Sequence, residues 1–410
     1  MGLDRVVEVR DRIGLQPYFP IISVGGTNGK GSTCAILEAV YKCAGYKTGL
    51  YTSPHLVSYN ERVRVNGEEV KDEELVGAFE RIDAARGEIP LTYFEFGTLA
   101  AQLIFCDDQV DVAILEVGLG GRLDAVNAFE PDCSVVLNVA IDHVDFLGAS
   151  RELIGLEKAG IFRRGKPAIC AEEEPPASLL DYANSTGAEL HLAGRDFGHT
   201  RSATGWQFWN AAGKKSGLPF PLLRGGSQLY NAAAAFECVH AMRAHFPVDM
   251  AALRGGLLDA YLPGRFQVLP GAPLIILDVA HNVAAAQVLS TDLKTLPCSG
   301  KTIAVFGVLA DKQIEQIASA LASSVDEWFV CGLRTSRGAD AESVKRMLMR
   351  SAPNKPVSSL GSVAQGYAAA REVARGNDRI LVFGSFYTVS EALETIGQRL
   401  TASRENGESD

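Results

Sequence analysis

The sequence lacks several features that would mark a membrane, secreted or nucleic-acid-binding protein. No apolar run approaches the roughly 20 residues that span a bilayer, and residues 1–5 lack the basic and then apolar layout of a signal peptide. The eight cysteines include no C-x-x-C pair, so we interpret them as buried, reduced thiols of a cytoplasmic protein. The net charge of −10 argues against a nucleic-acid partner, although a local basic pocket could still hold an anionic ligand.

What the sequence contains is an ordinary globular composition, 47% hydrophobic and 21% charged, over 410 residues, a length sufficient for two domains. Continuous apolar strands alternate with helix-like segments, which predicts parallel sheets covered on both faces. The expected strands are residues 21–24, 48–52, 110–117, 133–139 and 167–171 in a first series, and 274–279, 302–308, 327–331 and 379–383 in a second.

Proline and glycine interrupt the pattern at residues 262–267, so we predict two α/β domains, residues 1–264 and 265–410. The polar stretch 194–226 is expected to form loops or an antiparallel excursion. The tail 403–410 is expected to be disordered.

A glycine loop follows the first expected strand and precedes a segment with helical periodicity. Glycine-loop N–H groups and a helix N-terminus bind phosphate, Lys30 adds a charge, and Ser32 could ligate Mg²⁺. The loop is not a standard Walker A motif, because Gly31 separates Lys30 from the hydroxyl residues Ser32 and Thr33. The plain alternative is a glycine turn with a chance lysine, but the flanking strand and helix favour a phosphate site.

Three polar residues follow other expected strands of the first domain. Glu116 ends one strand, where ligands of open α/β sheets bind, so it is a Mg²⁺ ligand, an acidic helix cap or part of a solvated turn. His143 lies between two aspartates and is either a metal ligand or part of a loop ion pair, since Mg²⁺ prefers oxygen. Ser53 precedes Pro54, and by itself favours a simple turn.

In the second domain, Asp278 and His281 follow a strand and could reach a ligand, while Asn282 could cap the next helix. Asn231 and Arg265 are isolated polar residues that the pattern alone does not single out.

Together these motifs resemble the dihydrofolate synthase/folylpolyglutamate synthase family of the Mur ligase superfamily. The resemblance spans about residues 26 to 390, nearly the whole chain. It rests on the runs 26–32, 53–55, 115–124, 157–161, 263–266 and 278–282. It implies a Mur-ligase-type α/β fold, with an N-terminal P-loop ATPase-like domain that contains a mostly parallel sheet and a smaller Rossmann-like C-terminal domain.

The resemblance also implies a role for each matching position. Catalytic roles fall to Lys30, Lys158 and His281; nucleotide binding to Asn28, Gly29, Lys30, Gly31, Ser32, Asn231, Arg265 and Asp278; metal binding to Ser53, Glu116, His143 and Lys158; and substrate binding to Thr92, Tyr93, Phe94, Glu95, Arg122, Leu123 and Asp124. Phe94 would stack on the pterin, and Lys158 would be carbamylated so that it helps to hold one of two Mg²⁺ ions.

The implied activity is ATP-dependent addition of L-glutamate to dihydropteroate and to reduced folates through an acyl phosphate, by an enzyme expected to be a cytoplasmic monomer. The alternatives are a monofunctional folylpolyglutamate synthase, another Mur-type amino-acid ligase, or a P-loop protein that uses ATP only as a switch. Family members usually carry an N-terminal helical segment before the stretch that matches residues 2–5. Its absence here indicates a misassigned start or a shortened chain, and would leave the first domain slightly less stable.

Overall fold

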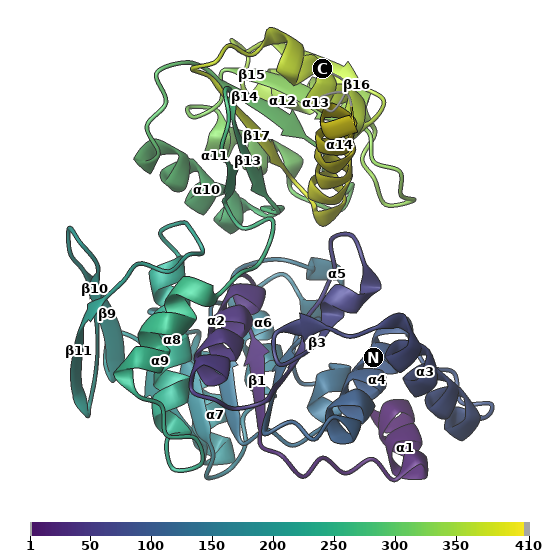
Figure 1. Ribbon diagram of the computed structural model, residues 1–410, viewed down its shortest axis with the longest axis vertical. Helices are drawn as coiled ribbons and strands as arrows, with labels where there is room; N and C mark the ends of the chain where they lie inside the picture. Colours follow the sequence, from purple (N-terminus) through teal and green to yellow (C-terminus); the bar gives the residue numbers. More distant parts are fainter. Residues whose placement is uncertain (1, 406–410) are drawn as a thin grey trace. The chain divides into compact units, whose positions relative to one another are not determined.

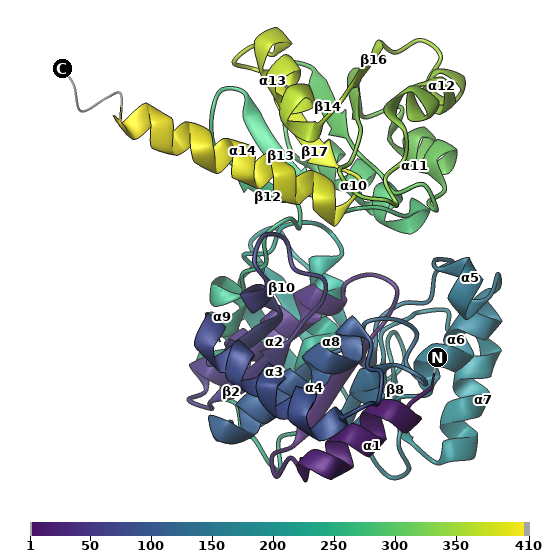
Figure 2. The ribbon, with the colours of Figure 1, turned by 90° about the vertical axis from the view of Figure 1, so that its right-hand side faces the viewer.

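The computed structural model describes residues 2–405, and the chain separates into two compact units (Figures 1 and 2). The first unit comprises Met1–Leu222 and Ser227–Leu262, and the second comprises Leu223–Gly226 and Pro263–Asp410. Within the described residues, no helix combines the length and the apolar character needed to cross a membrane.

An eight-stranded sheet forms the centre of the first unit, in the order β4-β3-β2-β5-β1-β6-β7-β8. Neighbouring strands from β2 to β8 run parallel, whereas β3 and β4 add an antiparallel edge. The strands are β1 (Ile21–Gly25), β2 (Thr48–Tyr51), β3 (Val63–Val65), β4 (Glu68–Glu69), β5 (Val112–Glu116), β6 (Cys133–Val136), β7 (Pro167–Cys170) and β8 (Glu189–Leu192).

Helices cover both faces of this sheet, as continuous apolar strands require. Alternate strand residues such as Ile21 and Leu115 pack into one core with α1 (Asp4–Ile13), α3 (Asp72–Arg86), α4 (Tyr93–Asp107), α6 (Arg151–Ala159) and α7 (Ala177–Thr186). Against the other face lie α2 (Lys30–Cys43), α8 (Gln228–Ala241) and α9 (Met250–Asp259) (Figure 1). Gly256 allows α9 to pack closely on α2, because a Cβ there would lie 2.4 Å from Val40 Cγ2.

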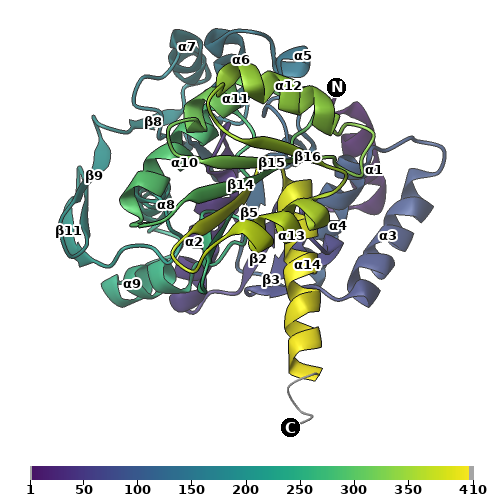
Figure 3. The same cartoon turned by 90° about the horizontal axis from the view of Figure 1, so that it is seen from above.

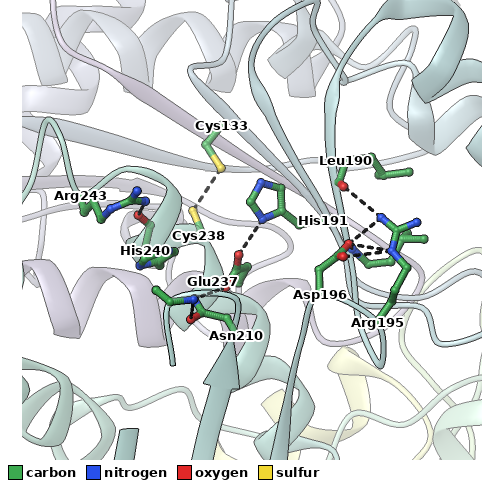
Figure 4. A network of polar contacts seen from close by, with 12 residues as sticks. Cys133, Leu190, His191, Arg195, Asp196, Asn210, Glu237, Cys238, His240 and Arg243 are labelled. Atoms are coloured by element: carbon green, nitrogen blue, oxygen red, sulfur yellow. Dashed lines mark hydrogen bonds and ion pairs between the residues drawn. The ribbon is translucent and has the colours of Figure 1, made fainter. Parts of the chain in front are cut away.

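A small antiparallel sheet lies outside α8 and consists of β9 (Phe197–Arg201), β10 (Trp206–Asn210) and β11 (Gly213–Leu218) (Figure 1). Trp206 and Phe208 attach it to α8, with ring centroids 5.3 and 5.8 Å from that of Phe236. Asn210 adds a polar link, since its Nδ2 donates to Glu237 Oε2 at 2.8 Å (Figure 4). The antiparallel excursion predicted for residues 194–226 is therefore present.

The second unit contains a six-stranded sheet in the order β12-β13-β17-β14-β15-β16, parallel except at β12. Figure 3 shows α10, α11 and α12 along one face and α13 and α14 along the other. The elements are β12 (Gln267–Leu269), β13 (Leu274–Asp278), α10 (Val283–Thr295), β14 (Thr302–Phe306), α11 (Ile314–Leu321), β15 (Glu327–Cys331), α12 (Ala341–Ser351), β16 (Val357–Leu360), α13 (Val363–Val373), β17 (Arg379–Phe383) and α14 (Phe386–Glu405).

The predicted strand series and the two-sided helical cover are confirmed, but several strands end earlier than expected. Residues 117 and 137–139 leave the sheet because the chain turns there towards the site described below. The predicted disorder of 403–410 is wrong for residues 403–405, which belong to α14, and residues 406–410 lie outside the described part. None of the eight cysteines, all within that part, forms a disulfide, and Cys43 is exposed rather than buried.

Candidate active site

Several polar residues of the first unit, among them the predicted Ser53 and Glu116, lie at one edge of its sheet. Strands β2, β5, β1 and β6 are adjacent and parallel, so their carboxyl ends lie side by side. Ser53 follows β2, Glu116 ends β5, residues 26–29 follow β1, and Asn138 follows β6. This edge is where open α/β sheets bind ligands.

The loop after β1 has the geometry of a phosphate-binding turn. Gly26 and Gly29 have φ values of +143° and +87°, which favour glycine, and α2 begins at Lys30. The backbone also passes Asn231 closely, since a Cβ on Gly29 would lie 2.5 Å from Asn231 Oδ1. Lys30 Nζ donates to the carbonyls of Gly26 and Thr27 at 3.1 and 3.3 Å, so the ammonium lies over its own loop. A cradle of N–H groups with one cation can hold phosphates.

Two pairs of residues that the sequence did not reveal stabilise this loop by hydrogen bonds. Asn138 Oδ1 accepts from Asn28 N at 2.9 Å, and Asn138 Nδ2 donates back to Asn28 O at 2.9 Å. Thr27 Oγ1 donates to Ala140 O at 3.1 Å. The only local signal for Asn138 was a polar residue near the end of an expected apolar strand, and its partner lies 110 residues away.

Ser53 and Glu116, two of the expected metal ligands, lie next to each other. Glu116 is buried, and its Oε2 accepts from Ser53 N at 3.0 Å. A carboxylate and a serine hydroxyl are both oxygen donors, the kind of ligand that Mg²⁺ prefers. Among the described residues, no three or more His, Cys, Asp or Glu side chains are arranged so that they could hold a metal ion by themselves.

Lys158 is almost completely buried in α6, and burial lowers its pKa to about 7, with a further decrease from Lys30 that Asp142 and Asp124 oppose. Asp124 is buried as well, and this raises its pKa to about 6 even though the N–H groups of Leu119 and Val126 bind its carboxylate. Lys158 therefore has a neutral amine fraction near neutral pH.

His143 starts the short helix α5 (Val144–Leu147) in the loop that follows β6. Its backbone has φ 52°, which is uncommon for a residue other than glycine, and its N–H donates to Asp142 Oδ1 at 2.8 Å. The charge of Asp142 also raises the pKa of Lys158, so this loop lies close enough to influence Lys158. The role of His143 as a metal ligand stays a prediction.

In the segment 92–95, the side chains of Thr92 and Glu95 cap a helix, whereas those of Tyr93 and Phe94 do not. Thr92 and Glu95 form a capping box at the start of α4, and Arg5 donates to both oxygens of Glu95 at 3.2 and 3.3 Å. Tyr93 is exposed, whereas Phe94 packs beside Gly118, where a Cβ would lie 2.7 Å from the Phe94 ring. Phe94 therefore lies beside Gly118, two residues after Glu116 in the chain.

Arg122 and Leu123 belong to the motif of residues 115–124, and Arg122 connects this motif to α6. Arg122 donates to Glu157 Oε1 through Nε at 3.0 Å and Nη2 at 2.6 Å, and Leu123 is half-buried. Gly160 permits this contact, since a Cβ there would lie 2.3 Å from Arg122 Cβ. The ion pair attaches the motif to the helix that carries Lys158.

The remaining predicted residues belong to the second unit and form their own group. Asp278 Oδ2 and Oδ1 accept from Phe266 N at 2.8 Å and Ala280 N at 2.7 Å, and burial raises its pKa. Arg265 lies over the ring of Phe386, 5.0 Å from its centroid. His281 Nδ1 lies 2.9 Å from Val279 O and therefore carries the proton, because a carbonyl only accepts. Arg265, Asp278 and His281 are thus grouped near the end of β13.

Comparisons with known proteins match both units. The Mur ligase middle domain matches residues 24–239, and the Mur ligase glutamate ligase domain matches residues 264–386. The dihydrofolate synthase/folylpolyglutamate synthase of Escherichia coli (strain K12) is 45% identical over 400 residues, which cover 97% of this chain and 92% of that protein.

Solved structures of two relatives have the same fold as this chain. The E. coli FolC structure in complex with DHPP and ADP is 45% identical, with a TM-score of 0.92 and coverage of 97% of this chain and 94% of that one. A bifunctional folylpolyglutamate synthase/dihydrofolate synthase with Mn, AMPPNP and L-glutamate bound is 42% identical, with a TM-score of 0.90 and coverage of 97% and 94%. The fold, the sheet-edge site and these similarities establish that the chain belongs to the dihydrofolate synthase/folylpolyglutamate synthase family of Mur ligases.

Proposed function

We propose that this protein is an ATP-dependent ligase that joins L-glutamate to dihydropteroate and to reduced folates. The observation that carries the proposal is the grouping of the glycine loop with Lys30, the buried Glu116 and Ser53 at one sheet edge. Membership of the family supports it, since the relatives are named for both activities and are recorded with ADP or AMPPNP, with DHPP, and with glutamate.

The chemistry follows from what a carboxylate cannot do alone. It does not react with an amine at neutral pH, because its oxygen leaves poorly. Lys30 and the loop N–H groups would stabilise the γ-phosphoryl group of ATP as it passes to the acid and forms an acyl phosphate. The glutamate amine then attacks the acyl carbon, and phosphate departs with the C–O electron pair.

We further propose that Ser53, Glu116, His143 and a carbamylated Lys158 hold two Mg²⁺ ions. A divalent cation supplies charge neutralisation for the transferring phosphoryl group. Lys158 fits because its lowered pKa of about 7 leaves a neutral amine that can add CO₂, and the product contributes two anionic oxygens instead of an ammonium. A relative with Mn bound supports a divalent cation as such.

For the other predicted residues we propose the following roles. Asn28 to Ser32, Asn231, Arg265 and Asp278 bind the nucleotide, and His281 acts at the glutamate step. The residues that contact the pterin acid are Thr92, Tyr93, Phe94, Glu95, Arg122, Leu123 and Asp124. Thr92 and Glu95 also cap the start of α4. The chain acts as a monomer in the cytoplasm, where ATP and folates meet. Residues 1–264 form the ATP-binding domain and 265–410 the glutamate ligase domain, which the compact unit beginning at Pro263 and the family match from residue 264 support.

The test is ADP release with glutamate plus dihydropteroate, and separately with glutamate plus tetrahydrofolate, with each product identified by mass. Both acids should be extended by one glutamate per ADP. Product with tetrahydrofolate alone would indicate a monofunctional folylpolyglutamate synthase. ADP release without an amide product would contradict the ligase proposal and favour a nucleotide switch.

A further inference from the structure

Arg62 is a buried cation without an acidic partner among the described residues. It ends the short helix η1 (Tyr59–Arg62) and is 8% exposed. Its Nε donates to His55 Nδ1 at 2.8 Å, and its Cζ lies 5.4 and 5.2 Å from the ring centroids of Tyr59 and Tyr93. Among the side chains that the structure describes, those of residues 2–397, neither Nη atom has a hydrogen-bond acceptor. A buried charge is costly unless it is paired, so this arrangement calls for an anion from outside the chain.

The nearest acid in the sequence is already engaged. Glu61 accepts from the backbone N–H groups of Leu56, Val57 and Ser58 at 2.7, 2.6 and 2.7 Å, and so shapes the loop before η1. The two aromatic rings stabilise the Arg62 guanidinium in part, but a ring face offers no hydrogen-bond acceptor of carboxylate strength.

Arg62 is also fixed beside the candidate active site. Its carbonyl accepts from Thr52 N at 2.9 Å, and the next residue, Ser53, donates to Glu116. On its other side, Tyr93 opens α4 and precedes Phe94. The guanidinium therefore lies between the turn proposed to hold metal and the segment proposed to hold the pterin.

If the proposed function holds, the difference between dihydropteroate and a folate suggests what Arg62 binds. Dihydropteroate has a single carboxylate, which becomes the acyl phosphate beside Lys30 and Glu116. A folate that already carries glutamate has two, of which one reacts and the other stays an anion. A guanidinium held in a fixed plane binds a carboxylate through two parallel hydrogen bonds.

We propose that Arg62, held between Tyr59 and Tyr93, binds the non-reacting carboxylate of the folate substrate and so distinguishes folates from dihydropteroate. His55 acts as a positioning residue, because its Nδ1 accepts from Arg62 and fixes the plane of the guanidinium.

The first test replaces Arg62 by methionine, which keeps the apolar stem and removes the charge. The ratio of kcat/KM for tetrahydrofolate to kcat/KM for dihydropteroate should fall at least about tenfold, mostly through KM for tetrahydrofolate. Arg62→Lys should recover part of the ratio. The matched control is Arg81→Met, an arginine of α3 that pairs with Asp107 on the surface, and it should leave the ratio unchanged. An equal fall for both acids, or no fall, would overturn the proposal.

The second test works even if the variant folds poorly, because it uses the unaltered protein. Of the two monoamides of tetrahydrofolate, the one that still accepts glutamate lacks only the non-reacting carboxylate. In the unaltered protein its Kd should be at least about tenfold weaker than that of tetrahydrofolate, because the paired carboxylate is missing. Equal binding of both ligands to the unaltered protein would contradict the role of Arg62, whereas absence of product with either acid would contradict the ligase function itself.

Discussion

His191 Nδ1 lies 2.6 Å from Glu237 Oε1, and this pair connects the last strand of the first unit's large sheet to helix α8 (Figure 4). Glu237 is buried, and its second oxygen accepts from Asn210 of the small sheet. The hydrogen bond to Glu237 raises the pKa of His191, burial opposes this, and the charges of Glu237, Asp196 and Glu189 add to it. Three elements thus meet at one carboxylate.

We predict that this pair stabilises the fold more at low pH than at high pH. Because the folded-state pKa of His191 is raised, its contribution is fully present below the ordinary value of about 6.5 and is lost as pH rises through the raised pKa. His191→Asn should therefore reduce the free energy of unfolding by about 1 kcal/mol at pH 5.5 and by less at pH 8.5. Urea unfolding at both pH values measures this. His245→Asn is the control, and a penalty for His191→Asn that is independent of pH would contradict the prediction.

For the phosphate loop, Lys30→Ala should abolish product formation while the fold remains intact. Loss of a group that stabilises transition-state charge reduces the rate on the order of a hundredfold or more. The matched control is Lys42→Ala, at the opposite end of the same helix, which should retain turnover. Coupled ADP assays with circular dichroism measure both properties, and near-normal turnover of Lys30→Ala would remove Lys30 from the phosphate site.

Phe94→Ala should weaken use of dihydropteroate more than binding of ATP. Stacking on a planar heterocycle contributes roughly 1 kcal/mol, so KM for dihydropteroate should rise about fivefold. Phe96→Ala is the control, because Phe96 belongs to the same helix but packs against Phe79 in the core. An unchanged KM for dihydropteroate in Phe94→Ala would exclude Phe94 from the pterin site.

Lys158 should carry a carbamate, which electron density or an intact-protein mass increase in bicarbonate buffer would reveal. Lys158→Ala should lose activity and regain part of it with a small added carboxylate. Since the amine must be neutral to react, carbamylation should decline as pH falls below the lowered pKa of about 7. Density that ends at an unmodified amine, together with full activity of Lys158→Ala, would refute the carbamate.

Local sequence patterns were sufficient to predict the elements that depend on neighbouring residues. Apolar strands, the glycine loop before α2 and the polar residues at strand ends were all readable, because periodicity and turn chemistry act over a few residues. The motifs also identified the family before any contact was known. The capping box of Thr92 and Glu95 is equally local, because the two residues lie three positions apart, and their proposed contact with the substrate stays a prediction.

Contacts between distant residues, and the depth at which those residues are buried, depend on the packing of the whole fold. Asn138 supports Asn28 across 110 residues because strand β6 lies next to β1, an order that no local pattern encodes. Lys158 has a lowered pKa because packing removes it from water, and a lysine in a sequence shows nothing of its burial. The burial of Arg62 beneath the ring of Tyr93, which belongs to another helix, likewise has no signal in the local sequence. Strand order and desolvation are properties of the whole fold, so these parts of the site could not be predicted from the chain alone.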